Sequence, residues 1–504
     1  MSVAAGNLSE LVRAAAERSP DKAAFLSGPA TTTWREIDAQ VDAAAAALAG
    51  LGLEPGDRVA ISLANTLDFP VAYFGVLRAG LVAVPLNPGC TAQELRWTLS
   101  DSGARAVVVS PAGREVLEAL ADELPELAHV LVTGPAEGAT SWRDLLDAAA
   151  GRSPRTAGAG EDLAVLLYTS GTSGRPKGAM LPHRALLANL EQTARIEPPV
   201  MASDDVVLLV LPLFHVYGLN AALGSVARHA ATGLLVERFD PVETLAQLRR
   251  AGVTNVVGAP PMYVAWSMLP DVEQAFASVR LALSGAAPLP GPVLQRVLET
   301  TGRHVFEGYG LTETAPVVTT TLMSGGAKPG SIGRPVPGVE VRLLDERGAP
   351  AEEGDPGEVV VRGRNLFLGY WPDASGGPDD EGWFATGDVA LLDADGDLHL
   401  VDRRQDLVLV SGFNVYPREV EDVLLTHPEV AEAAVLGIAH PYTGEAVKAL
   451  VVRTAGSRLS AEDLIAHAAS SLARFKCPTA VEFVAALPRG ATGKVRKGRL
   501  RELA

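Results

Sequence analysis

Short apolar runs alternate with helix-forming stretches through the N-terminal part of the chain, and this alternation limits the possible folds. The runs 58–62, 83–86 and 106–110 each fit one buried strand, and helical periodicity marks residues 34–51 and 70–79 around them. The same alternation returns in the strand-like runs 205–211, 233–237, 255–258 and 281–284. Strands that alternate with helices indicate parallel sheets with helices on both faces.

The chain changes character after about residue 330. Its 504 residues are too many for a single core, so at least two domains are expected. Short strand-like runs separated by Gly, Asp and Pro then indicate antiparallel β structure, in the ranges 340–345, 357–362, 389–393 and 398–402. After residue 402 a compact pattern of strands and helices begins, and its roughly one hundred residues are enough for a small separate domain.

The charge balance and the cysteine count exclude several classes of protein. The formal net charge of −17 disfavours nonspecific binding to nucleic acid or to an anionic membrane. Cys90 and Cys477 are far apart in sequence, which excludes a disulfide framework and indicates a reducing compartment. Residues 1–20 lack the apolar core of a signal peptide. We therefore expect a cytoplasmic protein that does not bind nucleic acid.

One segment, residues 206–226, is almost entirely apolar and has the length of a membrane span. Pro212, His215, Gly218 and Asn220 interrupt it, and a spanning helix would have to accommodate all four. We predict a buried strand, a turn and a helix here, and no transmembrane segment.

The segment from Tyr168 to Gly178 is rich in glycine, hydroxyl side chains and cations, and it follows the apolar run 163–167. A strand that leads into such a loop can present backbone N–H groups to a polyanion, with a lysine adding charge. A Walker A loop would need glycine directly before the lysine, whereas Pro176 precedes Lys177 here. The segment therefore indicates nucleotide phosphate outside the P-loop NTPases, and a flexible surface loop is the alternative.

Further motifs follow towards the C-terminus. Tyr309 lies between glycines and could place its ring against a planar base. Thr312 offers a hydroxyl to a phosphate, and Glu313 offers the hard oxygen ligand that Mg²⁺ prefers. Asp388, in an exposed Thr-Gly-Asp turn, could bind ribose hydroxyls, and Lys494 lies on a glycine-flanked loop. Each motif alone fits an ordinary turn or surface charge, but their joint order does not.

In order and spacing these motifs resemble the adenylate-forming superfamily of acyl-CoA synthetases, aryl-CoA ligases, firefly luciferase and peptide-synthetase adenylation domains. The resemblance runs from residue 8 to residue 500. It implies an α/β fold with a large N-terminal AMP-binding and acyl-binding domain, residues 1–403, built of two stacked α/β sheet subdomains and a β-rich subdomain. It also implies a small, mobile α+β C-terminal domain, residues 404–504, that carries the catalytic lysine.

The resemblance implies an ATP-dependent ligase that works in two steps. A carboxylate and ATP give an acyl adenylate and pyrophosphate, and the thiol of coenzyme A (CoA) then displaces AMP. Lys494 would contact the carboxylate and the α-phosphate, Thr312 the α-phosphate, and Glu313 with Thr172 would hold Mg²⁺. The implied nucleotide-binding residues are Thr169, Ser170, Gly171, Thr172, Ser173, Gly174, Lys177, Gly285, Ala286, Ala287, Glu307, Gly308, Tyr309, Gly310, Asp388 and Arg403.

The identity of the acid depends on a second set of positions. The acyl-binding and pantetheine-binding residues implied by the resemblance are His215, Tyr217, Gly258, Ser284, Gly285, Gly310 and Gly412. Their neutral side chains favour a hydrophobic acid, and we expect a medium- or long-chain fatty acid. An aromatic acid stays open, and so does malonate, because Arg280 precedes the Ser284 segment and could pair with a second carboxylate.

Other activities are also compatible with the sequence. The chain could load a carrier protein instead of CoA, or it could be an inactive relative that only binds ligands. The presence of Lys494, Glu313 and Asp388 argues against the inactive relative. A homodimer, and regulation by acetylation of Lys494, which would cancel its charge, are kept as hypotheses.

Two positions depart from the family pattern. Glu307 stands where many relatives carry a neutral polar residue, and Gln405 stands at the hinge position where relatives carry Asp or Lys. Because the backbone at Gln405 can still turn, we expect the C-terminal domain to rotate between the two steps.

The hinge assignment predicts the effect of Gln405→Pro. Proline fixes φ near about −65°, so the variant should lose one half-reaction while retaining the other. Pyrophosphate exchange and thioester formation, measured separately, test this. Gln405→Ala leaves the backbone free and should retain both, and a Gln405→Pro variant with two intact half-reactions would place the hinge elsewhere.

Overall fold

The computed structural model describes residues 6–135, 137–152, 154, 156–169, 176–345, 347–352, 354–403, 406–410, 413–440, 443–489, 495–497 and 499–500. It divides into two compact units. The first comprises the described residues up to Pro329 together with Gly333–Glu340 and Arg362–Phe384. The second comprises Gly330–Ile332, Val341–Val361 and the described residues from Ala385 onward. The boundary expected at 403/404 stays a prediction.

The first unit contains a seven-stranded sheet in the order β7-β6-β5-β3-β4-β8-β9. All neighbouring strands are parallel except the edge pair β8–β9, which is an antiparallel hairpin. The central strands are apolar and buried on both faces, as expected of parallel strands covered by helices. The strands are β3 (Arg58–Ser62), β4 (Val82–Pro85), β5 (Ala104–Val109), β6 (His129–Val132), β7 (Thr140–Ser141), β8 (Leu163–Thr169) and β9 (Lys177–Pro182).

The first unit also contains a nine-stranded sheet in the order β16-β15-β14-β13-β12-β10-β11-β1-β2. Its centre, from β14 to β1, is parallel, and antiparallel pairs extend it at both edges. The strands are β1 (Ala23–Ser27), β2 (Ala30–Thr33), β10 (Val206–Leu209), β11 (Thr232–Leu235), β12 (Asn255–Gly258), β13 (Leu281–Ser284), β14 (Val305–Gly310), β15 (Val317–Thr320) and β16 (Arg334–Pro335). The predicted α/β class is confirmed, with mixed sheets.

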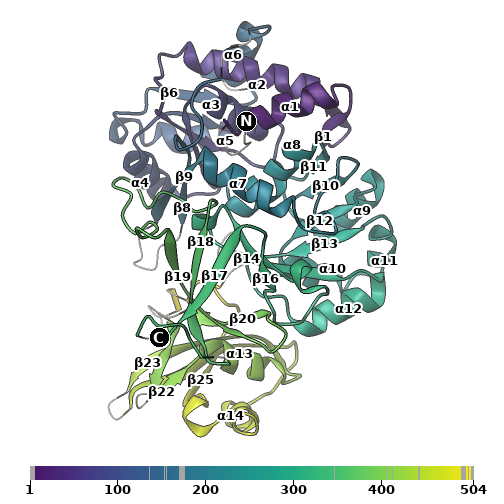
Figure 1. Cartoon of the computed structure of the whole chain (residues 1–504), viewed down its shortest axis with the longest axis vertical. Helices are drawn as coiled ribbons and strands as arrows, with labels where there is room; N and C mark the ends of the chain where they lie inside the picture. The colour runs from purple at the N-terminus through teal and green to yellow at the C-terminus, as the bar shows by residue number, and fades with distance from the viewer. Residues whose placement is uncertain are drawn as a thin grey trace. The chain divides into compact units, whose positions relative to one another are not determined.

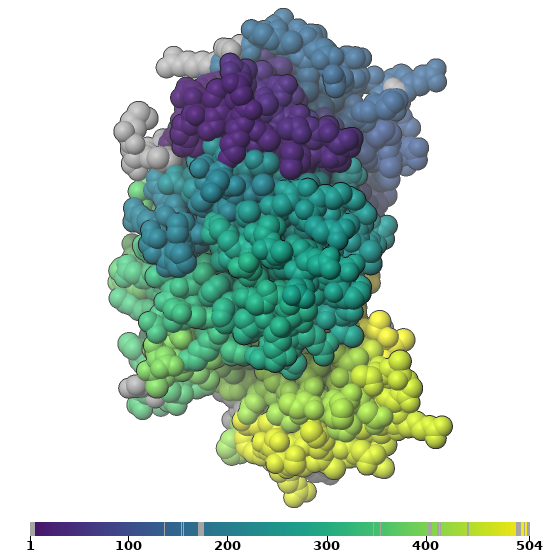
Figure 2. All heavy atoms as spheres, turned by 90° about the vertical axis from the view of Figure 1, so that its right-hand side faces the viewer, coloured from purple at the N-terminus to yellow at the C-terminus, as the bar shows by residue number. Residues whose placement is uncertain are grey.

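Helices cover both sheets of the first unit (Figure 1). Capping boxes at Thr33 and Thr91 start two of them, and Gly252 and Gly302 in the left-handed region end two others. Helices α9 to α12 form much of the surface that Figure 2 shows. The helices are α1 (Glu10–Arg18), α2 (Trp34–Ala49), α3 (Asp68–Arg78), α4 (Ala92–Ser102), α5 (Pro111–Glu118), α6 (Trp142–Ala149), α7 (His183–Thr193), α8 (Ser225–His229), α9 (Pro241–Ala251), α10 (Pro260–Trp266), α11 (Val272–Ala275) and α12 (Gly291–Thr301).

The apolar segment 206–226 folds as strand β10, a turn and a helix, as predicted, but the helix begins in π form over Tyr217–Gly224. Asn220 donates from Nδ2 to the carbonyl oxygens of Leu186 and Ala315, at 3.0 and 2.8 Å, so this helix is cross-linked to two neighbouring segments. Within the described part of the chain, none of the helices combines the length and apolar character that crossing a bilayer requires.

The second unit holds the C-terminal α+β structure and most of a four-stranded sheet in the order β17-β18-β19-β20, in which β19 and β20 are antiparallel. The apolar faces of α13 and α14 supply Val420, Leu424 and Leu464 to a core that strands β23 and β24 complete. The strands are β17 (Val339–Leu344), β18 (Gly357–Gly363), β19 (Trp383–Leu392), β20 (Leu398–Arg403), β21 (Val408–Val410), β22 (Phe413–Val415), β23 (Val430–His440), β24 (Gly444–Arg453) and β25 (Ala480–Phe483). The helices are α13 (Pro417–Leu425) and α14 (Ala461–Ala469).

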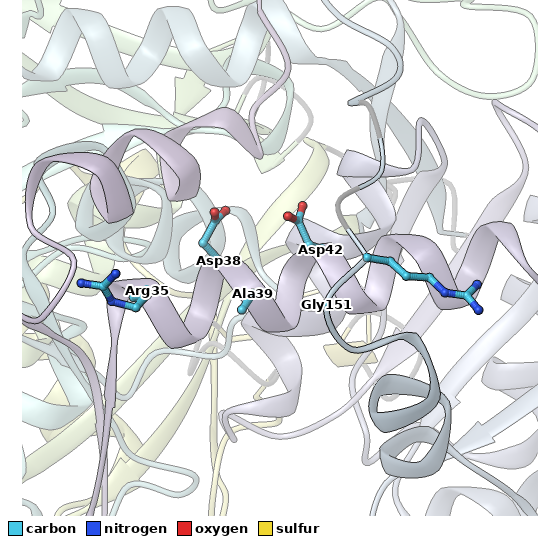
Figure 3. A pocket seen from close by; sticks show the side chains of 6 residues that line it. Arg35, Asp38, Ala39, Asp42 and Gly151 are labelled. Carbon is cyan, nitrogen blue, oxygen red and sulfur yellow. The ribbon is translucent and has the colours of Figure 1, made fainter.

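A buried ionic network joins α1, α2 and α3. Arg78 is fully buried, and its guanidinium lies 2.7 Å from a carboxylate oxygen of Asp38 and 2.7 Å from one of Asp42. Arg13 pairs with Asp42 as well, at 2.8 Å. A pocket of about 260 Å³ opens beside the network, and Figure 3 shows the two carboxylates of α2 in its wall. No residue of the implied nucleotide or acyl set lines this pocket, so we interpret the network as structural.

The network predicts a large effect of Arg78→Met on stability. The substitution keeps an apolar stem but removes the buried partner of two carboxylates, which typically costs about 3 kcal/mol or more. All six tryptophans lie in the first unit, at positions 34, 97, 142, 266, 371 and 383, so their fluorescence during urea unfolding reports on it. Arg143→Met, at an exposed pair with Asp147, should change the free energy of unfolding by less than about 0.5 kcal/mol. Equal effects of the two substitutions would contradict the structural interpretation.

Candidate active site

The implied phosphate loop lies at the end of the β8–β9 hairpin. Tyr168 pairs with Gly178 and Thr169 with Lys177, so the hairpin brings the two ends of the loop side by side. The hydroxyl of Thr169 donates to the carbonyl oxygen of Lys177 at 3.4 Å. The implied loop residues between these ends lie outside the described residues; they are Ser170, Gly171, Thr172, Ser173 and Gly174.

The hairpin is held by contacts on its outer side. The hydroxyl of Tyr168 donates to Asp101 at 2.6 Å, and the ring of Trp97 packs edge-on against Tyr168 at 5.5 Å. Burial, with the bond to Asp101, raises the pKa of the Tyr168 phenol, so this group stays neutral. The backbone N–H of Trp371 donates to Gly178 at 2.8 Å. The hairpin therefore presents the loop from a fixed base.

Thr312 and Glu313 lie in a short 3-10 turn, Thr312–Thr314, after β14, and both are buried. The turn is tied down by backbone contacts from distant segments. Asn365 donates from Nδ2 to the carbonyl oxygen of Thr314 at 2.7 Å. The backbone N–H of Phe367 donates to the carbonyl oxygen of Glu313 at 2.9 Å. The predicted phosphate contact, Thr312, and the predicted metal ligand, Glu313, thus lie on irregular backbone whose carbonyl groups are hydrogen-bonded.

The structure brings Glu313 together with Lys177 through a residue that the sequence did not indicate. The hydroxyl of Tyr370 donates to Oε1 of Glu313 at 2.6 Å. Nζ of Lys177 lies over the same tyrosine ring, 5.1 Å from its centroid. No spacing rule links residue 370 to residues 177 or 313, so only the folded chain reveals this contact.

Glu313 fits the implied Mg²⁺ as a carboxylate ligand. No group of three or more His, Cys, Asp or Glu side chains that could hold a metal occurs among the residues described. Mg²⁺ in nucleotide sites is usually held by one or two carboxylates together with substrate phosphates, so a single buried carboxylate beside the phosphate loop agrees with such a site. Thr172, the other implied ligand, lies outside the described residues.

The segment implied to border adenine follows β13. Gly285 and Ala287 flank Ala286, whose φ of 70° places it in the left-handed region. Glu307, which the family pattern left unexplained, is buried and accepts a hydrogen bond at Oε2 from the N–H of Leu289 at 2.9 Å. Glu307 thereby ties this segment to β14, and its predicted contact with the nucleotide stays a prediction.

Tyr309 lies on β14 opposite Thr319, with Gly308 and Gly310 on either side. A Cβ on Gly310 would lie 1.8 Å from the carbonyl oxygen of Pro316, whereas a Cβ on Gly308 would meet nothing closer than 3.5 Å. Gly310 is therefore required by the packing of the chain on itself. That requirement explains the glycine without any ligand.

The implied acyl positions gather at the carboxyl ends of β12 and β13, where Gly258 pairs with Ser284. A Cβ added to Gly285 would lie 3.0 Å from a ring carbon of Tyr217, and a Cβ added to Gly258 would lie 3.0 Å from a ring carbon of Tyr263. Both tyrosine rings therefore pack directly against a glycine. The N–H of Tyr217 donates to Nδ1 of His215 at 3.4 Å. The hydroxyl of Ser284 is buried and makes no hydrogen bond to the described residues.

The two phenols of this cluster are uncharged. Burial raises the pKa of both Tyr217 and Tyr263, so their phenols stay protonated. Tyr263 donates its hydroxyl to the carbonyl oxygen of Leu283 at 2.7 Å, and its ring packs edge-on against Trp266 at 5.7 Å. Of the implied acyl set, Gly412 lies outside the described residues.

Arg280, the candidate partner for a second carboxylate, is committed elsewhere. It precedes β13, whereas Ser284 ends that strand, so the two residues lie at opposite ends of it. Its guanidinium pairs with Asp205, with Nε 2.7 Å from Oδ1, and donates to the carbonyl oxygen of Pro199 at 2.9 Å. In open α/β sheets ligands bind at the carboxyl ends of the strands, so Arg280 is at the wrong edge for the acid.

The implied ribose-binding residues belong to the second unit. Asp388 on β19 stands directly opposite Arg403 on β20, so the structure makes them cross-strand neighbours. Asp388 is buried within the strand, and the expectation of an exposed turn was wrong because β19 begins at Trp383 and runs through it. Gln405 and Lys494 lie outside the described residues.

The segments on either side of residues 490–494 are anchored within the second unit. Arg489 pairs with Glu432 at 2.7 Å, and Lys497 pairs with Glu421 at 2.8 Å. An isolated β-bridge joins Arg489 to Val495. These contacts set where the chain enters and leaves the loop of the implied catalytic lysine.

Known proteins resemble the chain over nearly its whole length. The family of AMP-binding enzymes matches residues 12–371, and the AMP-binding enzyme C-terminal domain matches residues 419–494. A long-chain-fatty-acid–CoA ligase of Yersinia pestis is 37% identical over 98% of this chain and 94% of its own. A feruloyl-CoA synthase of an Amycolatopsis species is 37% identical over 96% of each chain. The crystal structure of ATP-bound MatB from Rhodopseudomonas palustris superposes with a TM-score of 0.90 at 34% identity, over 99% of each chain.

A buried histidine beside the hairpin predicts a pH dependence of stability. His183 follows β9, accepts at Nδ1 from the N–H of Leu8 at 3.1 Å, and has its pKa lowered to about 4 by burial. Because the unfolded side chain titrates near about 6.5, the stability from neutral His183 is complete above that pH and is lost as the pH falls towards about 4.

We expect the free energy of unfolding of the first unit to fall by about 3 kcal/mol over this range through His183 alone. Urea unfolding followed by tryptophan fluorescence at several pH values measures it. His183→Asn should flatten the pH dependence, whereas His304→Asn, at an exposed position, should leave it as in the wild type. An unchanged slope in His183→Asn would contradict the assignment.

Proposed function

We propose that this chain activates a hydrophobic monocarboxylic acid, with a medium- or long-chain fatty acid as the substrate. The chain belongs to the AMP-binding enzyme family and to its AMP-forming acid–CoA ligases. The observation that carries this proposal is the set of glycine, serine and uncharged tyrosine residues at the carboxyl ends of β12 and β13. Arg280 is paired with Asp205 at the opposite end of β13, so this arginine is not offered to a second carboxylate there. This argues against a dicarboxylic acid such as malonate.

In the first step the carboxylate of the acid attacks the α-phosphorus of ATP, and pyrophosphate leaves. Two anions approach each other, so fixed positive charge and hydrogen-bond donors must meet the α-phosphate. We assign Thr312 and Lys494 to this phosphate, and the loop that ends at Lys177 to the β- and γ-phosphates. Mg²⁺ held by Glu313 would neutralise phosphate charge when bound.

In the second step the thiol of CoA attacks the acyl carbon of the adenylate, and AMP leaves. Asp388 and Arg403 would hold the ribose, and Gly412 would let the pantetheine arm reach the acyl carbon. We further propose that residues 404–504 rotate about Gln405 between the steps, so that Lys494 serves only the first.

An aromatic acid is the second candidate, and one observation favours it. The hydroxyl-bearing edges of the Tyr217 and Tyr263 rings lie against Gly285 and Gly258, so two aromatic side chains border the implied acyl positions. Such side chains suit a planar ring as well as an alkyl chain. The feruloyl-CoA synthase among the similar proteins supports this alternative.

A substrate panel tests these proposals. Pyrophosphate exchange and thioester formation would be measured with fatty, aromatic and dicarboxylic acids, each with CoA and with a carrier protein. We expect exchange and CoA thioester with fatty acids, and the aromatic candidate gains if cinnamate-like acids react faster. Exchange without any CoA thioester would contradict a CoA ligase and favour carrier loading.

The assignment of Lys494 predicts a split between the two half-reactions. Lys494→Ala should slow adenylation by roughly 10²- to 10³-fold, the usual cost of losing one transition-state donor. Thioester formation from supplied acyl adenylate should persist. Lys448→Ala, at an ion pair 3.0 Å from Glu482 in the same unit, should retain both activities. Adenylation that survives Lys494→Ala would refute the assigned role.

A further inference from the structure

Tyr370 is held in place by the chain around it. Its backbone N–H donates to the carbonyl oxygen of Ser375 at 2.8 Å, and an isolated β-bridge joins it to Ala179, the third residue of β9. The ring of Phe367 packs edge-on against its ring, with centroids 5.1 Å apart. The phenol is therefore a fixed group with little freedom to follow its neighbours.

The hydroxyl of Tyr370 fixes the orientation of the Glu313 carboxylate. A hydrogen bond of 2.6 Å to Oε1 commits one of its two oxygens and restricts rotation of the group. No other described residue donates to this carboxylate, so the bond from Tyr370 is the polar contact that orients it. A ligand oxygen that is fixed before the metal arrives binds it more tightly, because less freedom is lost on binding.

The ring of Tyr370 contacts Lys177, the cation of the proposed phosphate site. Nζ of Lys177 lies 5.1 Å from the ring centroid, within the range of a cation–π contact. Lys177 lies on the seven-stranded sheet, and Glu313 follows a strand of the nine-stranded sheet. One tyrosine thus contacts two oppositely charged side chains that come from different sheets.

We propose that Tyr370 is a positioning residue that holds Glu313 for a divalent cation and Lys177 for the phosphates that share this cation. The inference rests on the proposed function, since it takes Glu313 as the metal ligand. It adds a residue that acts through its contacts with Glu313 and Lys177. The hydroxyl orients the metal ligand Glu313, and the ring face holds the ammonium group of Lys177.

The Tyr370→Phe variant separates these two effects, because it keeps the ring and removes only the hydroxyl. Electron paramagnetic resonance of Mn²⁺, in the presence of a nonhydrolysable ATP analogue, measures the affinity for the cation. We expect roughly 10-fold weaker Mn²⁺ binding, the lower range seen when a group that orients a metal ligand is lost. Binding of the analogue without any divalent cation should stay unchanged.

A matched control is Tyr73→Phe. Tyr73 is a fully buried tyrosine of the same unit whose hydroxyl makes no hydrogen bond to the described residues, so its loss should leave Mn²⁺ affinity unchanged. Tyr370→Leu removes the ring as well, and it should also weaken binding of the analogue in the absence of a cation. Unchanged Mn²⁺ affinity in Tyr370→Phe would overturn the proposal.

A double-mutant cycle with Glu313→Gln shows whether Tyr370 acts through the carboxylate. If it does, Tyr370→Phe has no further effect on Mn²⁺ affinity in the Glu313→Gln background. An equal further loss there would overturn the proposal and leave the proposed ligase function intact. Glu313→Gln with wild-type Mn²⁺ affinity would instead refute the metal assignment itself, and the proposal with it.

Discussion

Buried side-chain amides hold the irregular backbone on which the candidate site is built. Asn65 bridges the two sheets by donating to the carbonyl oxygens of Leu209 and Leu211, at 3.1 and 2.9 Å, and by accepting from the N–H of Leu213. Asn220 and Asn365 likewise donate to backbone carbonyl oxygens, those of Ala315 and Thr314. Loops placed between packed layers would otherwise carry unsatisfied N–H and C=O groups, each costing about 1–3 kcal/mol. The site loops can therefore be buried without being regular.

Local patterns were enough to predict much of this fold. Apolar runs located the central strands of both sheets, and the interruptions at Pro212 and Gly218 separated a buried strand and helix from a membrane span. The π start of that helix was not foreseen, since its cross-links through Asn220 depend on partners 34 and 95 residues away. Asp388 was misplaced for a similar reason, because a long strand overrode the turn signal of the glycine before it.

The site was predictable as a set of motifs but not as an arrangement. Thr312, Glu313 and Lys177 were singled out from their chemistry as candidates, whereas Tyr370 lies 57 residues from Glu313 and carries no distinguishing pattern. Glu307 was singled out as unusual, but only the structure shows that it bonds to the backbone of Leu289. Charge placement follows the same rule: Arg280 looked available in sequence, and its partner Asp205, 75 residues away, was invisible there.

The crowding around Gly310 bears on how this family is recognised from sequence. The glycine leaves no room for a side chain because the carbonyl oxygen of Pro316 occupies the space, and nucleotide has no part in that exclusion. A descendant that had lost catalysis but kept the fold would still need glycine here. This glycine therefore reports the fold, and evidence of activity in an uncharacterised relative must come from side chains that packing leaves free to change.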